Sequence, residues 1–149
     1  FKRINDTYGH GAGDRVLVAV AQCFQKENRT SDVHGRYGGE EFVLLLPETG
    51  REAAWGVAER LRRRIEELTI AVEGFEIRVT VSIGIATYDA ECRNLEGLLD
   101  RSDQALYAAK SSGRNRICIW PEPPVTRSNE KDSEVVPVAA RREARFSNS

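Results

Sequence analysis

The spacing of hydrophobic residues divides the first 120 residues into segments of two kinds. In three segments apolar residues recur every three to four positions, which predicts amphipathic helices. In shorter segments apolar residues alternate with others or form brief runs, which predicts strands. The expected helices are 12–27, 49–68 and 95–112, and the expected strands are 33–37, 41–46, 69–73, 75–87 and 116–120.

Turn and cap residues between these segments agree with this division. Gly38 and Gly39 separate the first two strands and predict a hairpin. Gly74 predicts a second turn, and Gly113 follows the third helix, where glycine often ends helices. Thr49, with a glutamate three positions later, predicts a capping box for the second helix. The order helix, strand, strand, helix, strand pair, helix, strand predicts an α+β fold, with helices packed on an antiparallel-rich sheet.

The composition changes after Pro121. Four prolines lie within residues 121–149 among serine, asparagine, glutamate and arginine, and few large apolar residues remain. Such a segment buries too little apolar surface to offset the entropy lost on ordering. We therefore expect one domain over residues 1–120 and a disordered tail over residues 121–149.

Size, charge and cysteine content narrow the class of protein. The 149 residues suit one domain, and the formal net charge of −1 argues against a broad nucleic-acid-binding surface. Arg60, Arg62, Arg63 and Arg64 cluster locally, which we interpret as the solvated face of a helix. The three cysteines match neither a zinc site nor a disulfide framework, so we expect a reducing, cytoplasmic compartment. No apolar run approaches the roughly 18 residues of a membrane span, so we expect no membrane contact by this segment, although a parent protein could be membrane-anchored. The chain begins with Phe1 rather than methionine, which indicates a fragment.

The segment Arg36–Phe42 carries the most specific chemical signal. Its two glycines allow a sharp turn and a close approach to a ligand, and Glu40 and Glu41 follow directly. Neighbouring side chains on a strand point to opposite faces, so we expect the two acids to have different tasks. A carboxylate at a hairpin tip can bind Mg²⁺, which prefers oxygen ligands and substrate phosphates. Taken alone, however, the tetrad favours a simple turn with solubilising acids.

Several further motifs change that interpretation. They are Phe1–His10 followed by Gly13 and Asp14, Arg36–Phe42, Ser82–Gly84, Asp103–Tyr107 with Lys110, and Ser112–Asn115. In this order and approximate spacing they closely resemble the GGDEF family over nearly all of residues 1–120. The signature reads Gly-Gly-Glu-Glu-Phe here, a variant with glutamate at the third position.

The resemblance implies a palm-like fold related to nucleotide polymerases and adenylyl cyclases. Family members bind one GTP each and work as a face-to-face homodimer, in which the 3′-hydroxyl of each GTP attacks the α-phosphate of the other. The products would be cyclic di-GMP and two pyrophosphates. Paired Mg²⁺ ions, with Mn²⁺ as an alternative, would clamp the attacking and leaving oxygens. The expected function is therefore that of a diguanylate cyclase, joined in its parent protein to an upstream sensory domain.

The resemblance also implies a role for individual residues. Glu40 matches the residue that binds Mg²⁺ and is proposed as the general base, and Glu41 matches the second signature acid, a further expected metal ligand. Asn5 and Asp14 match the pair that reads guanine. A carboxylate can accept from both the N1–H and the N2 amino group of guanine, which adenine does not offer. His10 matches a substrate-contacting position, although a loop histidine satisfied by backbone groups is a competing interpretation.

The resemblance implies that the GTP phosphates are held from two places. Lys110 and Arg114 match phosphate-binding cations, which suits a flexible ammonium and a fork-shaped guanidinium. The alternative is that they complement the dipole at a helix C-terminus. Phe1 and Lys2 match a loop whose backbone N–H groups contact the phosphates.

A second site is expected to bind the product. Arg29 and Asp32 form an R-x-x-D pattern shortly before Gly38, which resembles the inhibitory motif of many family members, and Arg60 matches the arginine that completes it. Two guanidinium groups can fork onto the phosphates and guanine edges of cyclic di-GMP. The competing interpretation is a pair of ordinary polar residues on a loop.

One part of the family pattern is not found in the chain. The family's first metal ligand is an aspartate on a strand that precedes the position of Phe1, so we expect this fragment to lack that strand and to be inactive by itself. The main alternative function is a non-catalytic GGDEF domain that senses GTP or cyclic di-GMP, and the intact Glu40 and Glu41 favour the enzyme. A purely structural dimerisation module and an adenine-using cyclase are both disfavoured, because the nucleotide-reading positions, Asp14 among them, are kept.

Overall fold

The computed structural model describes residues 1–92, 94–121 and 136–143. These residues form the helices α1 (Lys2–Tyr8), α2 (His10–Glu27), α3 (Arg51–Glu66) and α4 (Leu95–Ser111). They also form the strands β1 (Val33–Gly38), β2 (Glu41–Leu46), β3 (Thr69–Val72), β4 (Phe75–Arg78), β5 (Thr80–Ile85), β6 (Ile117–Ile119) and β7 (Val136–Glu143). None of the helices in these ranges combines the length and the apolar character needed to cross a membrane.

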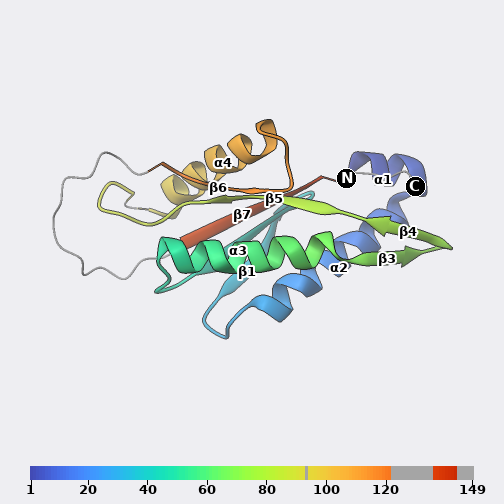
Figure 1. Ribbon diagram of the computed structural model, residues 1–149, viewed down its shortest axis with the longest axis horizontal. Coiled ribbons are helices and arrows are strands. Elements are labelled where there is room, and N and C mark those ends of the chain that lie inside the picture. Colours follow the sequence, from blue (N-terminus) through green and yellow to red (C-terminus); the bar gives the residue numbers. More distant parts are fainter. Residues whose placement is uncertain (93, 122–135, 144–149) are drawn as a thin grey trace.

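Five strands form the main sheet, in the order β1-β2-β7-β5-β6. Its neighbouring strands are antiparallel, apart from β5 and β6, which run parallel. A separate two-stranded sheet is formed by β3 and β4. Figure 1 shows α4 on one side of the main sheet and α2 and α3 on the other. The predicted α+β fold, an antiparallel-rich sheet covered by helices, is therefore confirmed.

The larger part of the core lies between the sheet and the pair α2 and α3. Along β2 burial alternates, so that Phe42, Leu44 and Leu46 are buried and the residues between them are half-buried. The ring of Phe42 stacks on that of Phe24 in α2, with 5.2 Å between the ring centroids. In β5, by contrast, every residue after Thr80 is buried. This is expected of a strand that helices cover on both faces.

Gly84 allows α4 to pack directly on β5. A Cβ atom at this position would collide with the backbone carbonyl of Ser102 and the backbone amide of Leu106. Because both obstacles are backbone atoms of a packed helix, no side-chain rotation could relieve the collision. The Ser82–Gly84 motif therefore has a structural role in addition to its place in the family pattern.

Three local expectations are wrong in part. Lys2, expected on a loop, is the first residue of α1, a helix whose one buried residue, Ile4, leaves too short a periodicity to be recognised. The expected strand 75–87 is divided after Arg78, because β4 pairs with β3 whereas β5 joins the main sheet. The expected capping box is absent, since the N-cap of α3 is Gly50 and the hydroxyl of Thr49 donates to the carbonyl of Pro47 at 2.9 Å.

The C-terminal segment also differs in part from the expected disordered tail. Residues 136–143 form β7, which lies at the centre of the main sheet and pairs antiparallel with both β2 and β5. Pro137 and several charged residues in this segment argued against a central strand. The pairing of its backbone with two neighbouring strands depends on residues far away in the sequence, so no local pattern reveals it. The rest of the expected tail, residues 122–135 and 144–149, lies outside the described residues.

Candidate active site

One end of the main sheet brings several sequence motifs together. Glu41 lies opposite Arg141 of β7, and Arg141 lies opposite Ser82 of β5. Neighbouring strands are about 4.8 Å apart, so the backbones of Glu41 and Ser82 are separated by roughly 10 Å. The hydroxyl of Ser82 accepts a hydrogen bond from the backbone N–H of Asn115 at 3.2 Å. The signature hairpin and the turn after α4 therefore lie at the same end of the sheet, beside the N-terminus (Figure 1).

The signature segment forms the predicted hairpin between β1 and β2. Gly38 pairs with Glu41, so that Gly39 and Glu40 make the turn. Neither glycine has a positive φ, and a Cβ atom at Gly39 would meet no atom within 4 Å. Gly39 thus leaves open space beside the turn, whereas a Cβ atom at Gly38 would lie 3.3 Å from Oε2 of Glu41. The guanidinium of Arg36 donates to the carbonyl of Gly39 from Nε at 3.0 Å and from Nη2 at 2.5 Å, which restrains the turn.

The two signature acids have different surroundings. Glu40 lies in the turn, whereas Glu41 is the first residue of β2 and lines a pocket of about 120 Å³ between β2 and α4. Asp100 and Asp103 of α4 line the same pocket, together with Tyr37. The second signature acid therefore faces α4 and its carboxylates.

The donor chemistry of this hairpin fits Mg²⁺ bound together with a nucleotide. In the described part of the chain, no three acidic, histidine or cysteine side chains converge as a metal site. Mg²⁺ does not need such a set, because it keeps several waters and binds through one or two carboxylates together with substrate phosphates. Glu40 and Glu41 offer carboxylate oxygens next to the open space at Gly39. Their role as metal ligands stays a prediction.

The junction of α1 and α2 places Asn5 against Gly13. A Cβ atom at Gly13 would collide with Oδ1 of Asn5 and would lie 3.1 Å from the ring of Phe1. This Oδ1 atom is buried and has no hydrogen-bond partner among the described residues. A buried acceptor without a donor costs free energy, so it marks a position where a ligand or a water is expected to donate. Asp14 follows Gly13 and is exposed, and His10, expected on a loop, is the first residue of α2 and is also exposed.

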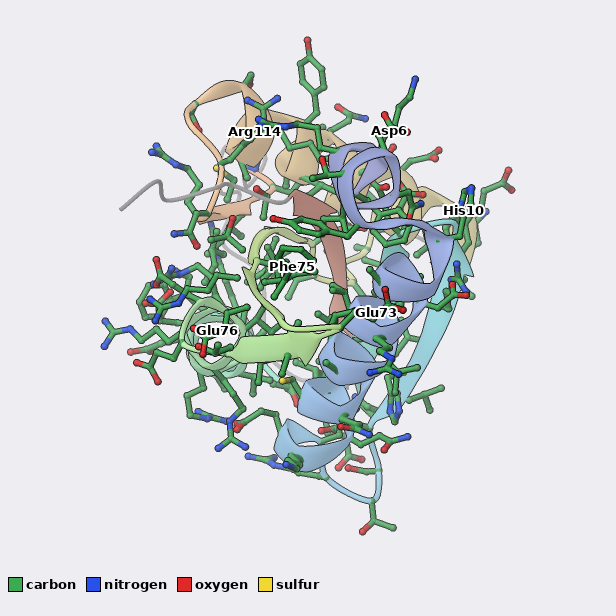
Figure 2. All side chains as sticks on the ribbon, turned by 90° about the vertical axis from the view of Figure 1, so that its right-hand side faces the viewer. Asp6, His10, Glu73, Phe75, Glu76 and Arg114 are labelled. Carbon is green, nitrogen blue, oxygen red and sulfur yellow. The ribbon has the colours of Figure 1, made fainter. Side chains whose placement is uncertain are left out.

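Local contacts hold α1 in this position. Ile4 is fully buried, and the ring of Tyr8 lies 5.2 Å from that of Phe75 in β4. Gly9 joins α1 to α2 with a φ of 82°, a conformation that favours glycine. In Figure 2, which views the molecule from this end, Asp6, His10 and Arg114 lie around the same side.

The predicted phosphate-binding residues lie at the end of α4 and in the turn after it. Lys110 belongs to the last turn of α4. Gly113, Arg114 and Asn115 follow with φ values of 124°, 62° and 48°. A left-handed backbone costs a residue other than glycine about 1–2 kcal/mol, so other contacts must stabilise Arg114 here. One of them is the hydrogen bond from its backbone N–H to the carbonyl of Ala109 at 3.0 Å.

The predicted product-binding residues lie at the opposite end of α2. The backbone N–H of Arg29 donates to the side chain of Asp32 at 2.8 Å, on the connection between α2 and β1. Arg60 of α3 forms an ion pair at 3.3 Å with Glu27, which precedes Arg29 by two positions. The structure thus brings Arg60 to the connection that carries Arg29 and Asp32, and their role in binding stays a prediction.

The arginine cluster on α3 contains one residue whose role the sequence analysis missed. The side chains of Arg60, Arg63 and Arg64 are 59%, 67% and 48% exposed, as expected of a solvated helix face. The side chain of Arg62 is only 14% exposed. Helical spacing does not single Arg62 out, because the exposed Arg64 likewise lies three positions after a buried residue, Leu61.

Comparisons with known sequences agree with this geometry. Residues 1–116 match the family described as "Diguanylate cyclase, GGDEF domain". Diguanylate cyclase A of Treponema denticola is 46% identical over 119 residues, which cover 80% of this chain and 32% of that protein. Diguanylate cyclase DosC of Escherichia coli K12 is 42% identical over 121 residues, which cover 80% of this chain and 26% of that protein. The chain thus spans about a third or less of the length of these curated relatives.

Solved structures show the same fold. The active GGEEF domain of a diguanylate cyclase from Vibrio cholerae superposes with a TM-score of 0.73 at 38% identity, covering 82% of this chain and 77% of that one. The GGDEF domain of DgcB from Caulobacter crescentus, solved in complex with c-di-GMP, gives a TM-score of 0.76 at 30% identity. The superposition covers 79% of this chain and 70% of that one. With the family match extending over residues 1–116 and the signature hairpin in its expected place, the chain belongs to the GGDEF family.

Proposed function

We propose that this domain condenses two GTP molecules into cyclic di-GMP and two pyrophosphates as one half of a homodimer. The observation that carries the proposal is the buried Oδ1 of Asn5, which lacks a donor among the described residues. It lies against Gly13 in the junction of α1 and α2, and Figure 2 shows Asp6 of α1 and Arg114 around the same side of the molecule. The acidic hairpin turn lies at the same end of the main sheet as the turn that carries Arg114. A base-reading acceptor, carboxylates and cations at one end of a sheet suit a purine nucleoside triphosphate. The curated relatives, named diguanylate cyclases, support the same activity.

Each proposed group has a task that suits its chemistry. Asn5 accepts from the N2 amino group of guanine, and Asp14 accepts from its N1–H side. Lys110 and Arg114 bind phosphate oxygens, and the backbone N–H groups at Phe1 and Lys2 add neutral donors. Glu40 and Glu41 hold Mg²⁺, which supplies Lewis-acid stabilisation of charge on the phosphates. Glu40 also accepts the proton of the attacking 3′-hydroxyl.

The first test concerns Glu40. In a protein extended upstream to include the family's first strand, Glu40→Gln keeps the side-chain volume but removes the charge, so cyclic di-GMP formation with GTP and Mg²⁺ should fall by at least about a hundredfold. Glu76→Gln makes the same change at an exposed position of β4, outside the main sheet, and should leave turnover unchanged. Normal turnover in Glu40→Gln would refute the assignment of Glu40. Binding of GTP by the unaltered protein without any turnover would instead favour the alternative of a nucleotide sensor.

The second test concerns base choice. Asp14→Ser removes a charged acceptor, and hydrogen bonds to charged groups contribute about 1.5–3 kcal/mol, or roughly ten- to a hundredfold in affinity. The preference for GTP over ATP in a binding titration should decrease by that factor. An unchanged preference would show that another residue reads guanine.

We also propose that cyclic di-GMP binds at Arg29, Asp32 and Arg60 and inhibits turnover by holding the two active faces apart. The proximity of Arg60 to the connection after α2 supports this, and so does the chemistry of paired guanidinium groups with phosphates. Arg29→Ala should weaken inhibition by cyclic di-GMP while the uninhibited rate stays comparable. Equal inhibition of the two proteins would contradict the proposal.

The proposed setting is a longer cytoplasmic signalling protein. Because this chain spans only a third or less of its curated relatives, those proteins have room for other domains. In the protein to which this chain belongs, we expect a sensory domain upstream. One similar structure, at a TM-score of 0.75 and 41% identity over 79% of this chain, is diguanylate cyclase SiaD of Pseudomonas aeruginosa in complex with its activator SiaC. A protein activator is therefore one form that the input signal of this domain could take.

A further inference from the structure

Arg62 of α3 uses its guanidinium to join two carboxylates and a distant turn. Its Nε and Nη2 atoms donate to the two carboxylate oxygens of Glu59 at 2.8 and 2.9 Å. Its Nη1 atom donates to Oε2 of Glu66 at 2.9 Å and to Oδ1 of Asn115 at 2.8 Å. The last of these bonds connects residues 53 positions apart in the sequence. Arg62 therefore links α3 to the turn that follows α4.

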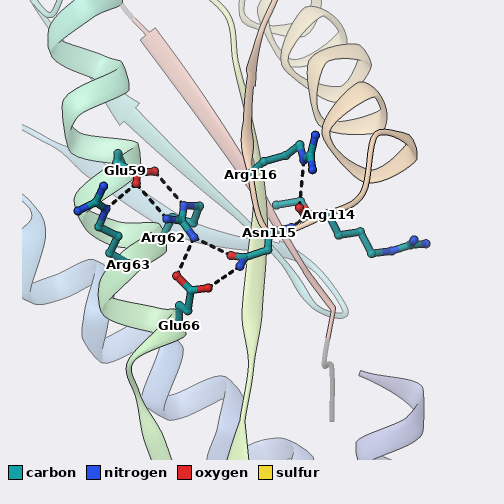
Figure 3. A network of polar contacts seen from close by, with 8 residues as sticks. Glu59, Arg62, Arg63, Glu66, Arg114, Asn115 and Arg116 are labelled. Atoms are coloured by element: carbon teal, nitrogen blue, oxygen red, sulfur yellow. Dashed lines mark hydrogen bonds and ion pairs between the residues drawn. The ribbon is translucent and has the colours of Figure 1, made fainter. Parts of the chain in front are cut away.

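The side-chain amide of Asn115 completes a closed ring of hydrogen bonds. While its oxygen accepts from Arg62, its Nδ2 atom donates to Oε1 of Glu66 at 2.6 Å. Figure 3 shows this ring, with Glu59 and Arg63 extending it along α3. The hydrogen bond from Asn115 is the largest cause of the lowered pKa of Glu66, which keeps that carboxylate ionised. Both polar ends of the Asn115 amide are thus held by charged groups, the stronger class of hydrogen bond.

The ring holds Asn115, which belongs to a strained turn, and Arg114 precedes Asn115 directly in that turn. Arg114 and Asn115 both have left-handed backbone conformations, and the backbone N–H of Asn115 donates to the buried Ser82. Such conformations persist when surrounding contacts over-determine them, and they gather at functional sites. In Figure 3 the side chain of Arg114 extends away from the ring. The contacts of Asn115 therefore determine where the Arg114 side chain starts and which way it leaves the turn.

We propose that Arg62, Glu66 and Asn115 position Arg114 for binding the phosphates of GTP. The proposal rests on the function proposed above and adds three positioning residues to it. They act on the phosphate end of the nucleotide only, because the ring lies on α3 and in the turn after α4, whereas the guanine-reading residues lie on α1 and α2. Loss of the ring should therefore weaken binding of GTP and leave binding of guanosine unchanged.

The experiment compares GTP with guanosine as calorimetric ligands of the purified chain, without divalent cations so that no turnover competes. Asn115→Asp sets a carboxylate oxygen against Oε1 of Glu66, where the amide now donates. Combining it with Glu66→Gln reverses the polarity of that bond, restores the ring and keeps the net charge. Asn115→Gly removes the ring contacts but suits the positive φ, which keeps the test open if the aspartate variant fails to fold. The matched control is Arg63→Ala, since Arg63 bonds Glu59 at 2.6 Å in the same cluster without contacting Asn115.

The expected results are specific to the phosphates. GTP affinity should fall about tenfold or more in Asn115→Asp and Asn115→Gly, which is the scale of one lost charged contact, and guanosine affinity should stay within about twofold. The double variant should recover GTP affinity to within about threefold of that of the unaltered chain. The control Arg63→Ala should bind GTP as tightly as the unaltered chain does. Three results would overturn the inference alone: unchanged GTP affinity in both single variants, equal losses for GTP and guanosine, or no recovery in the double variant. If the unaltered chain binds GTP no more tightly than guanosine, the phosphate-binding role of Arg114 is wrong, and the inference falls with it.

Discussion

Replacement of Gly13 by alanine should separate stability from base recognition. Gly13 lies in α2 without a positive φ, so alanine suits its backbone and, in a helix interior, would stabilise the protein by up to about 1 kcal/mol. The new methyl group would collide with Oδ1 of Asn5. That atom is the end of a flexible side chain, so Asn5 should rotate away at a cost of about 0.5–1.5 kcal/mol, and the two effects should nearly cancel. The carbonyl proposed to accept from the N2 amino group of guanine would then be displaced.

The assay compares GTP with ITP, whose base lacks the N2 amino group. Loss of one neutral hydrogen bond of about 0.5–1.5 kcal/mol should lower the preference for GTP over ITP by about two- to tenfold, with a melting temperature close to that of the unaltered chain. Gly11→Ala is the control, because Gly11 lies in the same helix and a Cβ atom there meets nothing within 4 Å. It should keep the base preference. If Gly13→Ala kept it too, or if both variants lost it equally, the proposed role of Asn5 would be wrong.

Three further predictions concern stability. Gly84→Ala should lower the free energy of unfolding by at least about 2 kcal/mol in chemical denaturation, since its methyl group meets the backbone of α4, whereas Gly35→Ala, with no atom within 4 Å, should change it little. Hydrogen bonding by Arg62 lowers the pKa of Glu59 from 4.5 to about 2, so ionised Glu59 stabilises the fold above pH 4.5, and this contribution is lost as the pH falls from 4.5 towards 2. At about 1.4 kcal/mol per pH unit, reduced for partial solvent screening, the loss should be about 1–3 kcal/mol, and an equal acid sensitivity in Glu59→Gln would contradict it. Asn94→Ala should cost about 1 kcal/mol in thermal unfolding, because the Asn94 side chain caps α4 through the N–H of Gly97 at 2.8 Å, and an unchanged melting temperature would show that this cap contributes nothing.

Local patterns predicted most of the framework and the family. The periodicity of α2, α3 and α4 is long enough to be recognised, because each has buried residues at helical spacing over more than three turns. The hairpin around Gly38 and Gly39 could be predicted because a pair of glycines separates two segments with the pattern of strands, and the structure pairs those strands. The order of motifs then indicated the GGDEF family, which the sequence comparisons confirm. These features share one property: the interactions that create them join residues close together in the chain.

The features that only the tertiary structure revealed depend on contacts between residues far apart in the chain. α1 has one buried residue, and its position depends on a contact between Tyr8 and Phe75. β7 looked like part of a disordered tail, because neither its proline nor its charges reveal that β2 and β5 both pair with its backbone. Arg62 looked like its solvated neighbours, since only the packing of α3 beside the turn after α4 buries it against Asn115. Sequence spacing shows which residue types are present, but burial and hydrogen-bond partners arise when distant elements pack, and they decide which of several similar residues acts on the site.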